Sequence, residues 1–415
     1  MIETILDLTP NLASIFGVHS EKVHYICPVM EKIERFLKIE LPAGQSAFLW
    51  GPRKTGKSTL LRTLFPNSKT YDFLETDLFF RFSNRPGLLG EELMALDPDL
   101  LSRPIILDEV QKIPKILDEV HRLIENQGIR FVLCGSSARK LRRGQANLLG
   151  GRAWRYELFP LVTAELKDWN LLDIINKGMI PSHYQQVDAR RSLRSYVQDY
   201  LMEEVFQEGL VRNIPSFSRF FDSVGFSHGE MTNYLNISRD CGVDSKTVRE
   251  YYQILIDTLM GIMLDPFKKR QTRQVITRTP KFYLFDTGVA GTITKRFINE
   301  ERGELFGKAF EHFILLEIVA FRSYHNLDFE IGYWRTKTGL EVDFILGDGE
   351  IAIEVKGSNR VESKDIIGIR TFNEELYPRK SIVVCNEPAE RKAGEIHIIP
   401  YRKFLEMLWE KEIIG

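Results

Sequence analysis

The sequence has no long hydrophobic segment and little cysteine. Its longest apolar run near the middle, residues 254–264, includes Asp257 and is far shorter than the roughly 20 residues needed to cross a bilayer. A membrane-spanning helix is therefore not expected. Neither a zinc site nor a disulfide framework is indicated, because the four cysteines have no paired spacing. They are Cys27, Cys134, Cys241 and Cys385.

The sequence also lacks an excess of charge of either sign. Lys and Arg total 56, and Asp and Glu total 57. This balance excludes a general attraction to nucleic acid or to an anionic membrane, so any such site has to be a local patch. The first ten residues carry Glu3 and Asp7 where a signal peptide would carry Lys or Arg. We therefore expect a cytoplasmic protein with no membrane partner.

The composition is that of a folded α/β protein with several domains. Hydrophobic residues make up 43% of the 415 positions and charged residues 27%, which is enough to form several cores. The length predicts about three domains. Residues 1–160 alternate apolar strand-like runs with helical stretches, which is typical of a parallel sheet covered by helices. Residues 161–300 have a mostly helical pattern, and residues 301–415 form a further α/β unit.

A glycine-rich motif at residues 51–58 predicts a nucleotide site. It matches G-x-x-x-x-G-K-[ST] and lies between a predicted strand at 47–50 and a predicted helix at 59–64. In this context the backbone N–H groups surround phosphates, Lys57 reaches the β- and γ-phosphates, and Ser58 binds Mg²⁺. ATP and Mg²⁺ are the expected cofactors. The expected binding residues are Gly51, Pro52, Arg53, Lys54, Thr55, Gly56, Lys57, Ser58 and Thr59.

An acidic pair predicts the second half of this site. The buried-type strand 104–107 ends in Asp108 and Glu109. We expect Asp108 to hold the Mg²⁺ shell and Glu109 to polarise the attacking water. A small-molecule kinase needs no such carboxylate, so an ATPase is favoured. Ser136, after the next predicted strand, is expected to help orient the water, and a plain Gly-Ser turn is the alternative.

Residues 130–155 contain seven basic side chains and no acidic one. Arg152 is the preferred candidate for an arginine finger that completes the ATP site of a neighbouring subunit, which predicts an active homo-oligomer. Contact with DNA is the alternative. The seven residues are Arg130, Arg139, Lys140, Arg142, Arg143, Arg152 and Arg155.

Residues 233–255 predict a helix-turn-helix, with two short helices around a turn that contains Gly242. The segment 268–281 that follows holds six basic residues and no acidic one, which fits the wing of a winged helix. Contact with DNA is favoured, and packing against another protein surface is the alternative. The residues expected at DNA are Lys246, Arg249, Gln253, Lys268, Lys269, Arg270, Arg273 and Arg278.

Two late strands carry a pattern that resembles the PD-(D/E)XK nuclease core. Glu354 and Lys356 share one face of a strand, and Asp343 on the preceding strand can lie opposite them. In such a core, the acids, here Asp343 and Glu354, bind Mg²⁺ and the lysine orients or activates water. A cross-strand ion pair without catalysis is the alternative. The helix 305–321 offers a further acid, either Glu311 or Glu317.

Taken together, residues 51–58, 107–112, 135–137, 151–152 and 159–161 resemble a family of predicted bacterial and archaeal AAA+ ATPases. The resemblance implies a P-loop AAA+ domain, a helical lid with a winged-helix adaptor, and a C-terminal α/β domain of the restriction-endonuclease type. It favours Glu311 as the fourth acid of the nuclease-like site.

The sequence is compatible with two functions. In the first, ATP turnover remodels DNA or positions it for cleavage by the C-terminal domain. In the second, ATP binding switches assembly, and a non-catalytic C-terminal domain recognises DNA or another partner.

Overall fold

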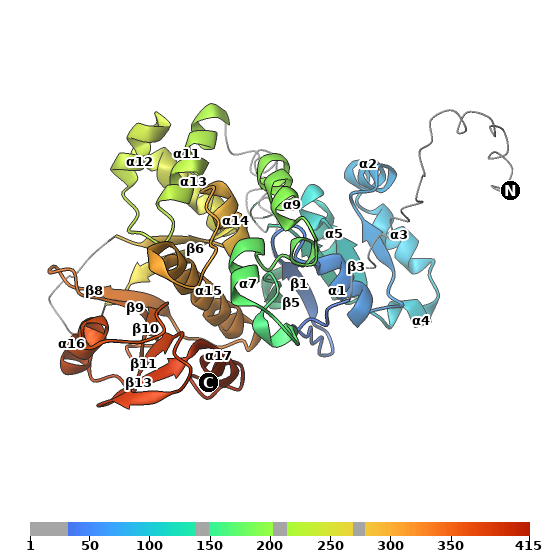
Figure 1. Cartoon of the computed structure of the whole chain (residues 1–415). Helices are drawn as coiled ribbons and strands as arrows, with labels where there is room; N and C mark the ends of the chain where they lie inside the picture. The colour runs from blue at the N-terminus through green and yellow to red at the C-terminus, as the bar shows by residue number, and fades with distance from the viewer. Residues whose placement is uncertain (1–31, 138, 140, 142–148, 202–213, 269–278) are drawn as a thin grey trace, which may run out of the picture. The chain divides into compact units, whose positions relative to one another are not determined.

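Five parallel strands form the first sheet of the computed structural model, in the order β2-β3-β4-β1-β5. Figure 1 labels β1, β3 and β5 of this sheet. The structure describes residues 32–415 apart from 138, 140, 142–148, 202–213 and 269–278. Because β4 lies between β1 and β3, the carboxyl ends of these three strands meet at one edge of the sheet. The strands are β1 (Ser46–Trp50), β2 (Thr70–Asp72), β3 (Ile105–Asp108), β4 (Phe131–Gly135) and β5 (Ala153–Glu157).

Helices cover both faces of this sheet, as the sequence predicts. Side chains alternate along β1, so that Phe48 and Trp50 share a core with α5, whereas Ala47 and Leu49 share a core with α1. The helices of this part are α1 (Lys57–Leu64), α2 (Thr76–Asn84), α3 (Leu88–Met94), α4 (Pro98–Leu101) and α5 (Ile116–Gln127), with short helices η1 (Val110–Lys112), η2 (Leu149–Gly151) and η3 (Thr163–Glu165).

A helical part follows. Helices α12 and α13 are joined by a turn at Gly242, whose φ of 67° is in the left-handed region that favours glycine. Val248, Tyr252 and Leu255 of α13 are buried in a core that α11 and α12 share. The helices are α7 (Leu171–Lys177), α8 (Pro181–Tyr184), α9 (Ala189–Ser195), η4 (Tyr196–Leu201), α11 (Ile214–Phe226), α12 (Tyr234–Cys241), α13 (Ser245–Asp257) and α14 (Thr287–Ile293).

The second sheet has the strand order β12-β13-β11-β10-β9-β8-β6-β7. The hairpin β6-β7 precedes residue 300, yet Asp265 and Pro266 of β6 pair in parallel with β8. One sheet therefore includes strands from both sides of residue 300, where the sequence predicts a boundary between two domains. The strands are β6 (Gly261–Pro266), β7 (Lys281–Leu284), β8 (Ile331–Arg335), β9 (Glu341–Leu346), β10 (Ile351–Lys356), β11 (Lys380–Cys385), β12 (Arg391–Ala393) and β13 (Ile396–Pro400).

Long helices pack against this second sheet, whose later strands are orange to red in Figure 1. Helix α15 contacts β10, and α16 contacts β9 and β10. These helices are α15 (Gly303–Tyr324), α16 (Ile367–Leu376) and α17 (Tyr401–Trp409), with η5 (Ser363–Ile366) before α16. Among the described residues, no helix is both long enough and apolar enough to cross a membrane.

A buried carboxylate joins α7 to α14. Asp286 is fully buried, and its Oδ1 accepts a hydrogen bond from Val289 N at 2.9 Å, which caps the start of α14. Its Oδ2 accepts from Met179 N at 2.6 Å, just after α7 ends. Gly178 is needed there, since a Cβ at this position would lie 2.0 Å from Asp286 Oδ1. Burial raises the pKa of Asp286 to about 6.

We predict that Asp286→Ala lowers stability by about 2–4 kcal/mol, because it removes a helix cap and leaves the buried Met179 N–H without an acceptor. Urea unfolding followed by circular dichroism would measure the loss. Asp188→Ala is the matched control, since Asp188 caps α9 at an exposed position by accepting from Arg191 N at 3.0 Å. Equal losses in the two variants would contradict the buried role of Asp286.

Candidate functional site

The glycine-rich loop takes a shape suited to phosphate. It follows β1, and α1 begins at Lys57 after Gly56, whose φ is 93°. The Nζ atom of Lys57 donates to Gly51 O at 2.7 Å and to Pro52 O at 3.0 Å. The ammonium group therefore lies inside the loop, with the first-turn N–H groups of α1 next to it. This geometry offers a phosphate a positive charge and free backbone donors together.

The serine of this loop contacts the acidic end of β3. Ser58 Oγ donates to Asp108 Oδ2 at 2.6 Å, and Asp108 Oδ1 accepts from Glu109 N at 3.0 Å. Glu109 has a φ of 55°, which is uncommon for a residue with a side chain and occurs at functional sites. The structure thus brings together Ser58, Asp108 and Glu109, as the sequence predicts, while Thr59 is exposed on the first turn of α1.

A buried glutamine joins the other two predicted groups. Gln111 Nε2 donates to Glu109 Oε2 at 2.6 Å and to Ser136 Oγ at 3.1 Å. A Cβ on Gly135 would lie 2.1 Å from Gln111 Oε1, so this glycine leaves room for the glutamine. Burial and the neighbouring Asp108 raise the pKa of Glu109, although Lys57 and other nearby groups lower it. Sequence reasoning assigned no role to Gln111; its position two residues after the acidic pair is the signal that was available.

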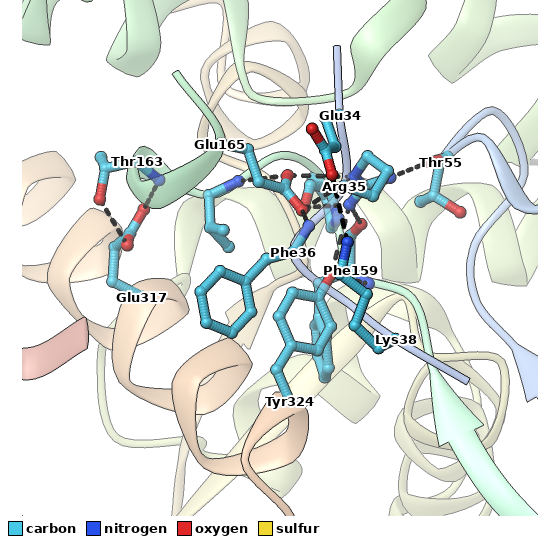
Figure 2. A network of polar contacts seen from close by, with 12 residues as sticks. Glu34, Arg35, Phe36, Lys38, Thr55, Phe159, Thr163, Glu165, Glu317 and Tyr324 are labelled. Atoms are coloured by element: carbon cyan, nitrogen blue, oxygen red, sulfur yellow. Dashed lines mark hydrogen bonds and ion pairs between the residues drawn. The ribbon is translucent and has the colours of Figure 1, made fainter. Parts of the chain in front are cut away.

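One buried arginine contacts the phosphate loop from outside the motif. Arg35 is 8% exposed, and its Nη1 donates to Thr55 O at 2.5 Å. Its Nη2 donates to Phe159 O at 2.8 Å and lies 3.3 Å from the hydroxyl of Tyr324. Its Nε lies 3.0 Å from both carboxylate oxygens of Glu165 (Figure 2). Arg35 therefore links the phosphate loop to the segment after β5 and to the end of α15.

The helical part also contacts the phosphate loop. Tyr196, at the start of η4, donates its hydroxyl to Arg53 O at 3.2 Å. The Lys54 Nζ atom lies 5.5 Å from the centre of the Tyr196 ring. Burial lowers the pKa of Lys54. This contact places Tyr196 beside the expected nucleotide position.

Two of the basic residues of 130–155 form ion pairs with acidic residues from distant segments, which the sequence does not show. Arg139 pairs with Asp257 of α13, and Arg152 pairs with Glu125 of α5. Arg152 precedes β5, and its carbonyl accepts from Ser46 N at 2.9 Å, so it lies at the sheet edge opposite the phosphate loop. Its action on a neighbouring subunit stays a prediction. Lys140, Arg142 and Arg143 lie outside the described residues.

The side chains expected at DNA are exposed on α13. Lys246, Arg249 and Gln253 all face solvent. The Arg249 guanidinium lies 4.3 Å from the centre of the Tyr234 ring, and Gln253 Nε2 donates to Asp257 Oδ1 at 2.8 Å. Lys268 is exposed after β6, whereas Lys269, Arg270, Arg273 and Arg278 lie outside the described residues.

The second sheet brings the nuclease-like residues together. Asp343 Oδ2 accepts from Val355 N at 2.7 Å, which fixes β9 beside the end of β10. Lys356 Nζ lies 2.5 Å from Glu354 Oε1. Burial raises the pKa of Asp343, and the nearby negative charge of Glu354 raises it further. Burial also raises the pKa of Glu354, to about 7. Burial lowers the pKa of Lys356, but the two carboxylates raise it more.

The acid of α15 that joins this cluster is Glu311. Its Oε1 accepts from the hydroxyl of Tyr283 at 2.5 Å and lies 3.4 Å from Lys281 Nζ. Lys281 also pairs with Glu341. Both Lys281 and Tyr283 come from β7, before residue 300, and sequence reasoning gave neither a role at this site. Their contribution depends on the pairing of the hairpin with the second sheet.

Glu317 lies in a different environment. Its Oε1 accepts from Thr163 N at 2.9 Å, and its Oε2 accepts from Thr163 Oγ1 at 2.8 Å and from Trp409 Nε1 at 2.7 Å. These contacts join α15 to η3, as Figure 2 shows for Thr163, and to α17. Burial raises the pKa of Glu317 to about 7. Glu317 therefore holds α15 to η3 and α17, and of the two predicted acids Glu311 is the one that lies near Asp343 and Glu354, while its role there stays a prediction.

One atom indicates that the cluster suits a cation. Glu354 is 5% exposed, and among the described residues its Oε2 has no hydrogen-bond partner. A buried, unpaired carboxylate oxygen is costly, and a divalent cation would satisfy it. Within the described ranges, however, no group of three or more His, Cys, Asp or Glu side chains is arranged to hold a metal ion. Asp343 and Glu354 would therefore supply two carboxylates to a cation, whose remaining ligands would be water or phosphate oxygens.

We predict that Glu317→Gln changes how stability depends on pH. The folded pKa of about 7 lies above the value near 4.3 of an unfolded glutamate, so the folded wild type binds more protons between these values. Its stability relative to the variant should fall by up to roughly 3 kcal/mol as pH rises through this window. Urea midpoints at pH 5 and pH 7.5 would measure this. Glu410→Gln, at an exposed position, is the control, and a pH-independent difference for Glu317→Gln would contradict the prediction.

Comparison with known families divides the chain into three segments. Residues 44–167 match a family model described as AAA domain. Residues 168–299 and 306–404 match two models described as domains of unknown function (DUF8612 and DUF4143). A comparison with curated proteins gives no match.

Two solved structures show partial similarity. The ORC1 protein of Aeropyrum pernix in complex with DNA has 15% identity, a TM-score of 0.23, and coverage of 62% of this chain and 87% of its own. A signal transduction ATPase with numerous domains and a tetratricopeptide repeat sensor, from Pyrococcus horikoshii, has 12% identity, a TM-score of 0.19, and coverage of 72% of this chain and half of its own. The family match, the parallel sheet and the phosphate loop agree, and residues 44–167 are a P-loop ATPase domain of the AAA type.

Proposed function

We propose that this protein hydrolyses ATP and acts on DNA through the carboxylate site of its second sheet. The proposal of ATP hydrolysis rests on a chain of hydrogen bonds at the phosphate loop. It runs from Ser58 through Asp108 and Glu109 to Gln111 and Ser136. It places a hydroxyl, two carboxylates and a second hydroxyl at the carboxyl edge of one sheet, beside the loop that holds Lys57.

Each of these residues has a distinct task in hydrolysis. Ser58 and Asp108 would hold Mg²⁺, which neutralises charge on the phosphates when bound. Lys57 binds the β- and γ-phosphates. Glu109 accepts a proton from water or orients it, and its raised pKa is consistent with a general base. Gln111 fixes the position of the Glu109 carboxylate relative to Ser136.

Two substitutions separate binding from turnover. Lys57→Ala should abolish ATP binding, because it removes the positive charge inside the loop. Glu109→Gln should retain binding and lower turnover by about 10²- to 10⁴-fold, since the phosphate loop stays intact. Binding of a fluorescent ATP analogue and phosphate release would measure the two properties.

Glu91→Gln is the matched control for this experiment, since Glu91 is an exposed glutamate on α3 of the same domain. Full turnover by Glu109→Gln would assign the water-activating role to another residue.

The proposal for DNA depends on the second sheet and on α13. Asp343 and Glu354 would hold a divalent metal, which stabilises charge on a phosphodiester. Lys356, which pairs with Glu354, would orient the attacking water. The helices α11 to α13 with the hairpin β6-β7 have the element order of a winged helix, and we propose that Lys246 and Arg249 contact DNA from it.

We predict that the wild type, with Mg²⁺ or Mn²⁺, cuts plasmid or linear DNA and that ATP changes the rate. Glu354→Gln and Lys356→Ala should each lower cleavage by at least about 100-fold. Lys364→Ala is the control, because Lys364 is an exposed lysine that pairs with Glu362 in the same part of the chain. Gel electrophoresis of time courses would measure the rates.

A wild type that leaves DNA intact under all these conditions would contradict the nuclease and favour a second function. In that function, ATP binding is a switch for assembly, and the second sheet recognises DNA or another partner without cutting. The contact of Arg35 with both Thr55 and Tyr324 favours it, because a change in the phosphate loop would reach α15 directly. The homo-oligomer and the role of Arg152 belong to either proposal.

A further inference from the structure

A basic cavity in the helical part has no role in the functions above. It has a volume of about 550 Å³, which is in the range of small-ligand sites. Its walls are formed by α7, by α9 with the residues before it, and by the end of α14 with the loop that follows. None of the residues expected at ATP, DNA or the carboxylate cluster lines it.

Four basic side chains of this cavity have no acidic partner. Arg190 and Arg194 lie four residues apart on α9, and Lys295 and Arg296 follow α14. In the part of the chain that the structure describes, no carboxylate is within ion-pair distance of any of them. Like charges at this helical spacing repel each other, so α9 carries an unfavourable pair. An anionic ligand would offset that repulsion.

The acidic residues that line the cavity are already engaged. Asp173 pairs with Lys177 at 3.0 Å on α7. Asp188 uses its carboxylate to cap α9 by accepting from Arg191 N. The charge of the cavity is therefore positive.

The wall formed by residues 295–299 is held in place before any ligand binds. Asn176 of α7 donates from Nδ2 to Ile298 O at 2.8 Å and accepts at Oδ1 from Ile298 N at 2.9 Å. Lys295 has a φ of 54°, and Arg296 N donates to Gly291 O at 2.9 Å, which turns the chain back at the end of α14. This fixed backbone lowers the entropic cost of ordering the two basic residues on binding.

An exposed aromatic ring lies beside these charges. Phe297 is 52% exposed, and the Arg190 guanidinium lies 5.8 Å from the centre of its ring. Val187, at the same cavity, is 95% exposed. A flat apolar ring next to cations is the combination that binds a base and its phosphate, since the base stacks and the phosphate pairs with arginine.

We propose that this cavity binds a nucleotide unit of single-stranded nucleic acid, with phosphates at Arg190, Arg194, Lys295 and Arg296 and a base against Phe297. A duplex fits less well, because its bases are stacked inside and cannot reach an aromatic ring in a cavity. A free nucleotide shares this chemistry, and the experiment distinguishes the two sources. The cavity is separate from the proposed DNA-binding surface of α13. An experiment that contradicts one of the two proposed sites therefore leaves the other proposal standing.

The test uses the whole 415-residue chain and a fluorescent oligothymidine of about 20 nucleotides, with anisotropy measured at several salt concentrations. Replacing both Arg190 and Arg194 by alanine should weaken binding and flatten the log–log salt dependence by about 1.4, since each phosphate contact contributes about 0.7 on single strands. Phe297→Ala should weaken binding by about tenfold. Arg191→Ala is the matched control, because Arg191 is exposed on the same helix and does not line the cavity.

Three outcomes would overturn the proposal. The first is that the wild type does not bind the oligothymidine. The second is that Arg191→Ala weakens binding as much as the double variant Arg190→Ala/Arg194→Ala does. The third is that the salt dependence of binding changes only in the variant Lys246→Ala/Arg249→Ala. Competition with thymidine monophosphate identifies the source of the ligand. If only longer oligonucleotides displace the labelled oligothymidine, the cavity binds single-stranded nucleic acid. If an equimolar amount of thymidine monophosphate displaces it, the cavity binds free nucleotides and the proposal of a single-strand site is wrong.

Discussion

The burial of Arg35 is the constraint on which the arrangement of the chain depends. A guanidinium group inside a protein needs a carboxylate and several acceptors, and removing its partner costs about 3–5 kcal/mol. Glu165 supplies the charge, and the carbonyls of Thr55 and Phe159 accept the remaining hydrogen bonds. Because these acceptors belong to the phosphate loop and to the segment after β5, neither can move independently of Arg35.

The same short segment after β5 also meets the C-terminal helices. Glu165 holds Arg35, and two residues earlier Thr163 donates twice to Glu317 of α15, which also accepts from Trp409 of α17. Residues 163–165 lie near the end of the ATPase domain and contact Arg35 through Glu165 and helix α15 through Thr163. A displacement of this segment would change both sets of hydrogen bonds together, which gives a physical route between the phosphate loop and α15, the helix that also carries Glu311.

Local features of the site could be predicted from the sequence, and long-range ones could not. The strand at 46–50 and the loop that follows it are adjacent in sequence, so spacing alone places Lys57 and Ser58. Gln111 looks like an ordinary polar residue until β4 brings Ser136 beside it. Lys281 looked like part of a basic wing, and its contact with Glu311 follows from a parallel pairing of β6 with β8 that leaves no pattern in either strand. Glu311 and Glu317 could be distinguished only by their tertiary partners.

The position of Arg35 has a consequence for how such chains diversify. The segment that matches the AAA family begins at residue 44, nine positions after this arginine, and ends at residue 167. A fragment with those limits would keep the buried Glu165 and lose its only ion-pair partner within the described residues. The ATPase domain is therefore not a self-contained unit of exchange. Recombination that joined it to a different C-terminal half would have to carry along residues 35–45 before β1 and supply a replacement for the Tyr324 hydroxyl beside Arg35.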